Sequence, residues 1–390
     1  MHGFKRTFLL NVGARLQTAN VSRGNSVRCP EAESHSHLPT RFVPGTPCAY
    51  NPGCNWSFDT AARVRGRRHP SRPIDSEKHM TELRAVVVGT GMMGPGIAAT
   101  LAAGGIGTCL VSRKAESAGE GLLQAKALSS TLEKQGLLSS VQLATAMRCL
   151  SCSTDLDAQV VNADLVVESI PEDLALKQRF FQRLASVADK KTILASNTSG
   201  ISITAIAEGS EHPERILTTH FWNPPYLMPL VEVVMGKQTS EAVAQQTMDI
   251  LKGCGKIPVL VRKDTPGQLG NRLQHALVRE AIHIIHEGIA SAEDVDLAVK
   301  NGFGLRLPVW GVLEHADAVG LDLVKSVQDY VLPALRNETH ADPLLAEKVQ
   351  AGNLGAKTGR GFYDWTVRDM SAAKARRDEF LVRFLHDSRP

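Results

Sequence analysis

The 390-residue sequence lacks the features that would place it among membrane, zinc or disulfide-linked proteins. No apolar run reaches the roughly 20 residues that a membrane-spanning helix needs. The seven cysteines are scattered, and only Cys149 and Cys152 form a C-x-x-C pair. A structural zinc site would usually need a second such pair. We therefore expect reduced thiols and no metal.

The excess of positive charge belongs to one segment. Residues 1–79 hold 12 of the 44 Lys and Arg residues but only 5 of the 40 Asp and Glu residues. The remaining residues therefore carry a small negative net charge, although the whole chain is formally +4. Such a body shows no basic excess for binding nucleic acid.

Residues 1–79 are rich in Pro, Arg, Ser and His and show no sustained apolar period. The first 30 residues contain several arginines and no acid, which is typical of a mitochondrial transit peptide. In that case the protein would lie in the mitochondrial matrix. Alternatively, Met80 is the true start, the upstream part is a mis-assigned translation, and the protein is cytoplasmic. Both interpretations stay open.

Short runs rich in valine, isoleucine and leucine alternate with helical patterns from residue 80 onward. This alternation predicts a Rossmann-type, doubly wound parallel α/β sheet over residues 80–263. The expected strands are 84–89, 108–112, 163–168 and 192–196, and the expected helices are 97–104 and 174–188.

Strand patterns vanish after about residue 263, where Asp264-Thr-Pro-Gly267 interrupts the chain. We expect an all-helical C-terminal domain for substrate binding and dimerisation over residues 264–366, with helices at 270–287 and 319–335. Residues 367–390 form a charged tail. Its amphipathic segment 371–385 predicts a helix on the surface or facing a partner.

A glycine motif follows the first strand. Gly89, Gly91 and Gly94, with Met93 beside the last, form G-x-G-x-x-G between a strand and a helix. In that position Gly89 permits a tight turn, Gly91 lets the backbone approach a pyrophosphate, and Gly94 lets helix and strand pack closely. The motif predicts a dinucleotide cofactor at the helix N-terminus.

The end of the second strand bears on the choice of cofactor. NAD sites normally have Asp or Glu there, which accepts hydrogen bonds from the ribose. This chain has Ser112, Arg113 and Lys114 instead. A hydroxyl and two cations suit the 2′-phosphate of NADP(H), which we favour. The alternative is that Arg113 stacks on adenine in an NAD(H) site.

Polar residues follow later strands, where ligands collect in open α/β sheets. Ser199 follows the strand at 192–196, and His220 precedes Glu232 by twelve residues. A histidine with a nearby carboxylate can act as a general base held in place by that carboxylate. By itself, however, a lone histidine is more often structural.

From about residue 84 to 366 the chain resembles the 3-hydroxyacyl-CoA dehydrogenase family. The matching stretches occur in the family's order and spacing. They are GTGMMGPGIA, VVESIPEDLALK, ASNTS, HFWNPP followed by LVEV, DTPGQLGNR, GLD and GAKTGRGFYDW.

The resemblance implies an oxidoreductase of fatty-acid metabolism that moves a hydride between NAD(P) and the 3-hydroxy carbon of an acyl-CoA. It implies His220 as catalytic base, Glu232 as its orienting carboxylate, and Ser199 and Asn271 as donors to the substrate oxygen. It also implies a homodimer. The positions that match cofactor contacts in the family are Glu172, Lys177, Asn223 and Lys357.

The chain departs from the family in three ways. The segment 115–135 carries only Lys126 and Lys134, whereas acyl-CoA members usually have a lysine-rich helix there. Ser112 replaces an expected aspartate. The prolines around Asn223 look more like those of members acting on free hydroxy acids, such as gulonate dehydrogenase. A dehydrogenase of a free 3-hydroxy acid is therefore the alternative.

A third possibility is a retired enzyme with a structural role, as in the lens lambda-crystallins. The presence of Ser199, His220, Glu232 and Asn271 together argues against it. A protein without catalytic function has no reason to keep that set.

Overall fold

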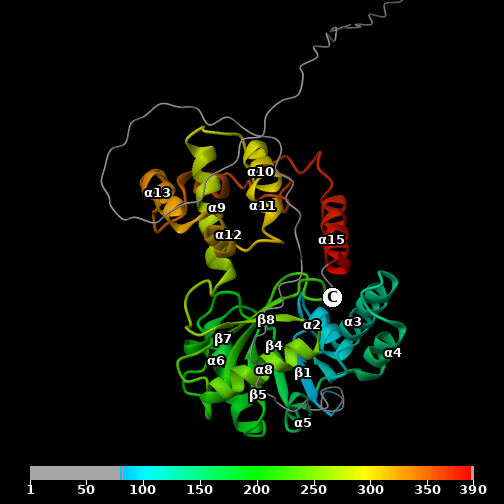
Figure 1. Cartoon of the computed structure of the whole chain (residues 1–390). Helices are drawn as coiled ribbons and strands as arrows, with labels where there is room; N and C mark the ends of the chain where they lie inside the picture. The colour runs from blue at the N-terminus through cyan, green and yellow to red at the C-terminus, as the bar shows by residue number, and fades with distance from the viewer. Residues whose placement is uncertain (1–79, 81, 388–390) are drawn as a thin grey trace, which may run out of the picture. The chain divides into compact units, whose positions relative to one another are not determined.

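The computed structural model describes Met80 and residues 82–387, so the expectations about residues 1–79 lie outside the described residues. In the described chain an eight-stranded sheet with flanking helices is followed by a helical C-terminal region (Figure 1). The predicted Rossmann fold with an all-helical C-terminal region is confirmed.

The sheet has the strand order β3-β2-β1-β4-β5-β6-β7-β8. The first six strands run parallel, whereas β7 is antiparallel to β6 and pairs in parallel with β8. The reversal at β7 was not predicted. The strands are β1 Arg84–Val88, β2 Gly107–Val111, β3 Leu150–Ser153, β4 Leu165–Glu168, β5 Ile193–Ser196, β6 Ile216–Phe221, β7 Leu230–Met235 and β8 Ile257–Val261.

Alternate residues of β1 enter two separate cores, because successive side chains of a strand point to opposite faces of the sheet. Ala85 and Val87 join the core that includes residues of α2 and α8, whereas Val86 and Val88 join the core that includes α6. Both faces are therefore covered, as a buried parallel sheet requires. The helices here are α2 Gly94–Ala103, α3 Ala115–Lys134, α4 Ser140–Cys149, α5 Leu156–Val160, α6 Leu174–Val187, α7 Ile203–Ile206 and α8 Glu241–Gly253, with the 3-10 turn η1 Pro213–Arg215.

The helical region begins with α9, which confirms the expected helix at 270–287. The expected helix at 319–335 is interrupted at both ends. Gly320 has φ 95°, which separates it from the preceding helix, and Pro333 lies in a 3-10 turn after Val331. The elements are α9 Gly270–His286, α10 Ala292–Asn301, α11 Phe303–Arg306, α12 Val312–Val319, α13 Leu321–Val331, η2 Leu332–Ala334, α14 Pro343–Gln350 and α15 Met370–Asp387.

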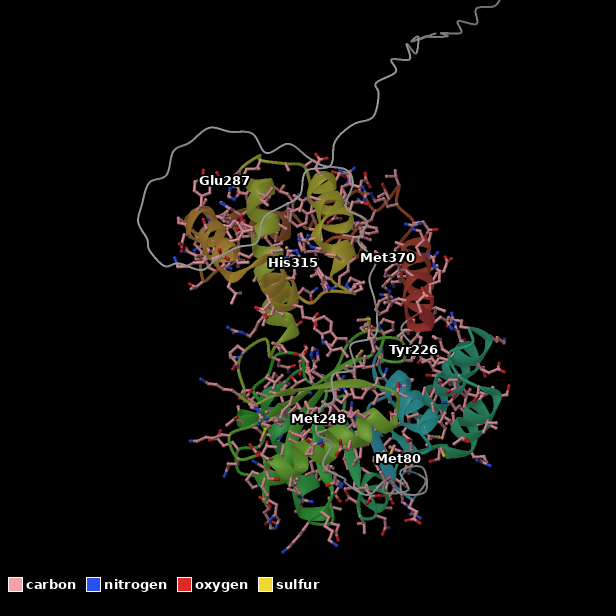
Figure 2. All side chains as sticks on the ribbon, viewed as in Figure 1. Met80, Tyr226, Met248, Glu287, His315 and Met370 are labelled. Carbon is pink, nitrogen blue, oxygen red and sulfur yellow. The ribbon has the colours of Figure 1, made fainter. Side chains whose placement is uncertain are left out.

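The predicted tail helix is α15, and part of its apolar side contacts this chain itself. Leu381, Val382 and Leu385 pack against the buried cluster of Leu132, Leu137 and Leu227. Figure 2 shows Tyr226, a partly buried member of the same cluster, close to the end of α15. No residue of α15 is fully buried, so the helix lies on the surface as expected, and contact with a partner stays a prediction. None of the described helices is long and apolar enough to cross a membrane.

Candidate active site

Three glycines shape the turn between β1 and α2. Gly89 has φ 109°, and a Cβ there would lie 2.4 Å from the Ser169 carbonyl oxygen. A Cβ on Gly94 would lie 1.9 Å from the Gly89 carbonyl oxygen. By contrast, no other described side chain or loop comes within 4 Å of a Cβ built on Gly91. The turn is thus tightly packed at two glycines and open at the third, which fits a dinucleotide phosphate at the N-terminus of α2.

The three residues after β2 lie beside this turn in the sheet order. Gly89 donates its N–H to the carbonyl oxygen of Val111, the last residue of β2, at 2.9 Å. Arg113 and Lys114 are both exposed, and Ser112 is partly exposed. Their side chains are therefore accessible to a ligand that extends from the glycine turn.

His220 and Glu232 lie directly opposite each other in the antiparallel pairing of β6 with β7. His220 Nδ1 is 2.7 Å from Glu232 Oε2, and both side chains are buried. A carboxylate can only accept, so Nδ1 carries the proton and donates. In the neutral ring Nε2 then keeps its lone pair, which is the form that a general base needs.

Glu232 is fully buried and accepts four hydrogen bonds. His220 Nδ1 and Trp222 Nε1 donate to Oε2, the latter at 3.0 Å. The amides of Leu269 and Gly270 donate to Oε1 at 2.8 and 2.9 Å. Burial by itself would raise the pKa of this carboxyl, but the four donors outweigh it and lower the pKa to about 2. Glu232 is therefore an anion at neutral pH and holds the histidine from behind.

Ser199, Asn271 and Glu172 meet in one hydrogen-bonded group. The Ser199 amide and hydroxyl donate to Glu172 Oε1 at 2.9 and 3.3 Å. Asn271 Nδ2 donates to the Ser199 carbonyl oxygen at 3.1 Å. Burial raises the pKa of Glu172, yet the bonds from Ser199, Lys177 and Thr198 outweigh it and lower the pKa. Glu172 is thus held ionised beside the two candidate oxygen-binding residues.

Lys177 is buried and lies behind this group. Its Nζ donates to Glu168 Oε1 at 2.6 Å and is 3.3 Å from Glu172 Oε2. Glu168 also accepts from the Ser196 hydroxyl at 2.6 Å. In this arrangement Lys177 positions Glu172, and a direct contact between Lys177 and the cofactor stays a prediction.

A cavity of about 500 Å³ brings together six of the expected site residues. His220, Ser199 and Asn271 line it, and Glu232 lies behind His220. Of the residues expected at the cofactor, Met93, Glu172 and Asn223 also line it. Lys357 is exposed in the loop after α14 and is not part of this lining, so its role stays a prediction. In the described chain, no group of three or more His, Cys, Asp and Glu residues could hold a metal ion.

The loop that joins β6 to β7 is held by a buried lysine. Lys256 Nζ donates to the carbonyl oxygens of Pro225 and Met228 at 2.6 and 2.9 Å. Burial lowers the pKa of this ammonium to about 8. This loop follows Phe221 and ends just before β7, so Lys256 fixes the connection between the strands that carry His220 and Glu232.

The sequence analysis missed Trp222 and the two amides at the start of α9 as partners of Glu232. An indole two residues after a candidate base was a usable signal, because indole N–H is a donor that seeks an acceptor when buried. His275, one turn after Asn271 on α9, also lines the cavity and was not predicted.

Comparison with known proteins identifies the family of the chain. The sequence model described as "3-hydroxyacyl-CoA dehydrogenase, NAD binding domain" matches residues 84–265, and the one described as "3-hydroxyacyl-CoA dehydrogenase, C-terminal domain" matches residues 267–365. Together they span most of the chain. The chain belongs to the 3-hydroxyacyl-CoA dehydrogenase family.

Two curated relatives show how similar other members are. A 5-formyl-3-hydroxy-2-methylpyridine 4-carboxylate 5-dehydrogenase of Mesorhizobium japonicum is 33% identical over 76% of this chain and 95% of its own. A probable 3-hydroxybutyryl-CoA dehydrogenase of Bacillus subtilis is 37% identical over 72% of this chain and 96% of its own. A solved structure of a dehydrogenase with the first activity, described as an NAD⁺-dependent dismutase, superposes with a TM-score of 0.72. It is 32% identical and covers 79% of this chain and 99% of its own.

Membership of the 3-hydroxyacyl-CoA dehydrogenase family confirms the sequence-based assignment of an oxidoreductase that acts on a CH–OH group of a small molecule with a nicotinamide cofactor. The glycine turn and the open side of Gly91 fit that cofactor.

Proposed function

We propose that this enzyme interconverts the 3-hydroxy and 3-oxo forms of an acyl-CoA, with His220 as the general base. The observation that carries the proposal is the buried His220–Glu232 pair at a cavity that Ser199 and Asn271 also line. The similarity to the probable 3-hydroxybutyryl-CoA dehydrogenase of Bacillus subtilis supports the same substrate class.

The roles of the residues follow from their atoms. In oxidation His220 Nε2 accepts the hydroxyl proton of the substrate, and the anionic Glu232 stabilises the imidazolium that forms. Asn271 donates a hydrogen bond to the substrate oxygen as its bond order changes, and so does the Ser199 hydroxyl once it turns away from Glu172. The nicotinamide, when bound, supplies the hydride acceptor. Reduction reverses these steps.

The assay that tests this function is a panel of 3-oxoacyl-CoA esters and the matching free 3-oxo acids, each with NADH and NADPH. A higher kcat/KM for the CoA esters than for the free acids supports the proposal. Turnover of the free acids alone would favour the second candidate, a dehydrogenase of free hydroxy acids. That candidate is favoured by one observation, since α3 carries only two lysines that could meet CoA phosphates.

We also propose a preference for NADP(H) over NAD(H). Ser112, Arg113 and Lys114 offer a hydroxyl and two exposed cations where a carboxylate would repel a 2′-phosphate. We expect kcat/KM to be higher with NADPH than with NADH, and Arg113→Ala to weaken NADPH binding while sparing NADH. A wild-type preference for NADH of about tenfold, a difference of about 1.4 kcal/mol in binding the two transition states, would contradict the proposal.

The assembly that we propose is a homodimer formed through the helical region. Large apolar side chains are exposed there, including Val309, Leu313 and Tyr330 at 81%, 80% and 86% exposure. Contiguous exposed apolar surface commonly marks a protein interface.

For the compartment we propose the cytoplasm, or the mitochondrial matrix if residues 1–79 act as a transit peptide. Cell fractionation distinguishes the two.

A further inference from the structure

A second cavity adjoins the site along helix α9. It measures about 700 Å³ and lies between α9 and the segment 338–345. Asn271 and His275 line both this cavity and the one that contains His220. A substrate whose CH–OH carbon lies beside His220 can therefore extend along α9 into the second cavity.

Three polar residues mark that path at regular spacing. Asn271, His275 and Arg279 are each four residues apart, which places them on one face of α9. Arg279 follows Asn271 by eight residues, or about 12 Å along the helix axis. Side chains of a helix generally lean toward its N-terminus, and for Arg279 that is the direction of His275 and the site. The cation lies within reach of a short substrate chain.

The charges around this cavity leave Arg279 available. The side chains of His275 and Arg279 have no hydrogen-bond or ion-pair partner within residues 82–387. The two acids that line the same cavity each have a basic neighbour, although Asp342 Oδ2 has no hydrogen-bond partner among the described residues. Glu338 pairs with Arg336, and Asp342 accepts from His286 Nδ1 at 2.7 Å and from the Leu344 amide at 2.9 Å.

We propose that Arg279, together with His275, binds a carboxylate of the substrate several bonds away from the reacting carbon. The inference rests on the proposed function, because it takes His220 as the position of that carbon. A guanidinium binds a carboxylate in a bidentate manner, and such a contact selects for substrates that carry the charge. The carboxylate is either the far end of an acyl chain in a CoA ester or the acid group of a free hydroxy acid.

Two matched substrate pairs test the subsite and identify the source of the carboxylate. In the first pair, 3-oxoacyl-CoA esters of equal chain length end in a carboxylate or in a methyl group. In the second, a free 3-oxo acid is compared with its methyl ester. Each is assayed for kcat/KM with the wild type, Arg279→Leu, Arg279→Lys and the control Arg179→Leu. Arg179 is an exposed arginine on α6 that lies outside both cavities.

The expected result is a loss that depends on substrate charge. Arg279→Leu should lower kcat/KM for the charged member of one pair by roughly tenfold to a hundredfold, the range of a charge-assisted hydrogen bond. The uncharged member should change less than about twofold, since it makes no such bond. Arg279→Lys should restore part of the loss, because it keeps the charge without the planar fork. Arg179→Leu should match the wild type.

Equal losses for both members of each pair, or a wild type that does not distinguish them, would overturn the subsite while leaving the proposed function intact. Titration with adipate by calorimetry gives a readout that does not depend on turnover. If no substrate is turned over, the proposed function fails. In that case, tighter adipate binding by the wild type than by Arg279→Leu supports the subsite, and equal or undetectable binding overturns it.

Discussion

The sheet region and the helical region differ in how far they bury their apolar side chains and provide hydrogen-bond partners for their buried carboxylates. In residues 84–261 the strands and their covering helices bury two extensive cores, and the buried carboxylates of Glu168 and Glu232 have several donors each. In residues 264–365 Ile282 is the sole buried large apolar side chain that the structure describes, whereas many leucines and valines are exposed. The sheet region completes its own core, and the helical region needs another surface to cover its apolar side chains.

This difference explains how the site is divided. The rigid half comes from the sheet, where strand pairing fixes His220 opposite Glu232. The helical region contributes the first turns of α9. The amides of Leu269 and Gly270 donate to Glu232, and Asn271 donates to the Ser199 carbonyl oxygen, so these turns are held against the sheet region. We therefore expect the chemistry to depend on His220 and Glu232 of the sheet region together with Asn271 of α9, and the rest of the helical region to govern assembly and the reach of the substrate.

The strongest test of this division is the loss of the base. We expect His220→Ala to lower kcat by several hundredfold, since general base catalysis typically contributes about 10²–10⁴. Cofactor affinity should change little, because His220 lies on β6 and not at the glycine turn. Near wild-type kcat for this variant would place the base elsewhere. Steady-state kinetics with cofactor titration measures both quantities.

Glu232→Gln is expected to reduce kcat by less than His220→Ala, and also to reduce stability. The carboxylate accepts from two donors on each oxygen. A glutamine amide presents its NH₂ to one of these donor pairs in either orientation. Leaving buried donors unsatisfied costs about 1–3 kcal/mol each. Urea unfolding at pH 7 together with kcat tests this, and an unchanged free energy of unfolding would contradict it.

The acid range gives Glu232→Gln a second signature. The pKa of Glu232 is lowered in the folded state from 4.5 to about 2. Its contribution to stability is therefore present above pH 4.5 and is lost as the pH falls toward 2. In the variant this titration is absent, so stability should fall less steeply between pH 4.5 and 2 than in the wild type. Urea midpoints measured across that range give the comparison.

Features that depend on neighbouring residues in the sequence could be predicted, whereas features that depend on contacts between distant residues could not. The strand β1 and the helices α6 and α9 follow from local patterns, and the roles of His220 and Glu232 follow from the resemblance. The reversal of β7 does not, because its register is fixed by pairing with β6 rather than by its own sequence. The burial of Lys177 between Glu168 and Glu172 likewise depends on tertiary packing.

The helical region's exposed apolar surface predicts assembly. We expect light scattering at micromolar concentration to give twice the mass of one chain, and Leu313→Asp to shift the mass toward that of one chain. A charge buried without a partner destabilises an interface. Val141→Asp, at a position 76% exposed on α4 in the sheet region, is the matched control and should leave the mass unchanged. A wild-type monomer would refute the dimer.

The smallest effect is expected from removing residues 1–79. A chain that begins at Met80 keeps every contact of the described core, because Met80 and Leu83 pack against the cluster that β1 and α2 share. Met80, labelled in Figure 2, also lies against Gly253 at the end of α8, and its carbonyl oxygen accepts from the Leu83 amide at 3.3 Å. We therefore expect wild-type kcat and melting temperature, since the removed residues show no core-forming pattern.

A chain that begins at Arg84 is the sharper comparison. That chain loses the side chains of Met80 and Leu83 and should melt at a lower temperature. A fully buried methylene group contributes about 0.8 kcal/mol to stability, and these partly buried groups contribute less. Insoluble or inactive protein from the Met80 chain would show that the segment before it contributes to folding.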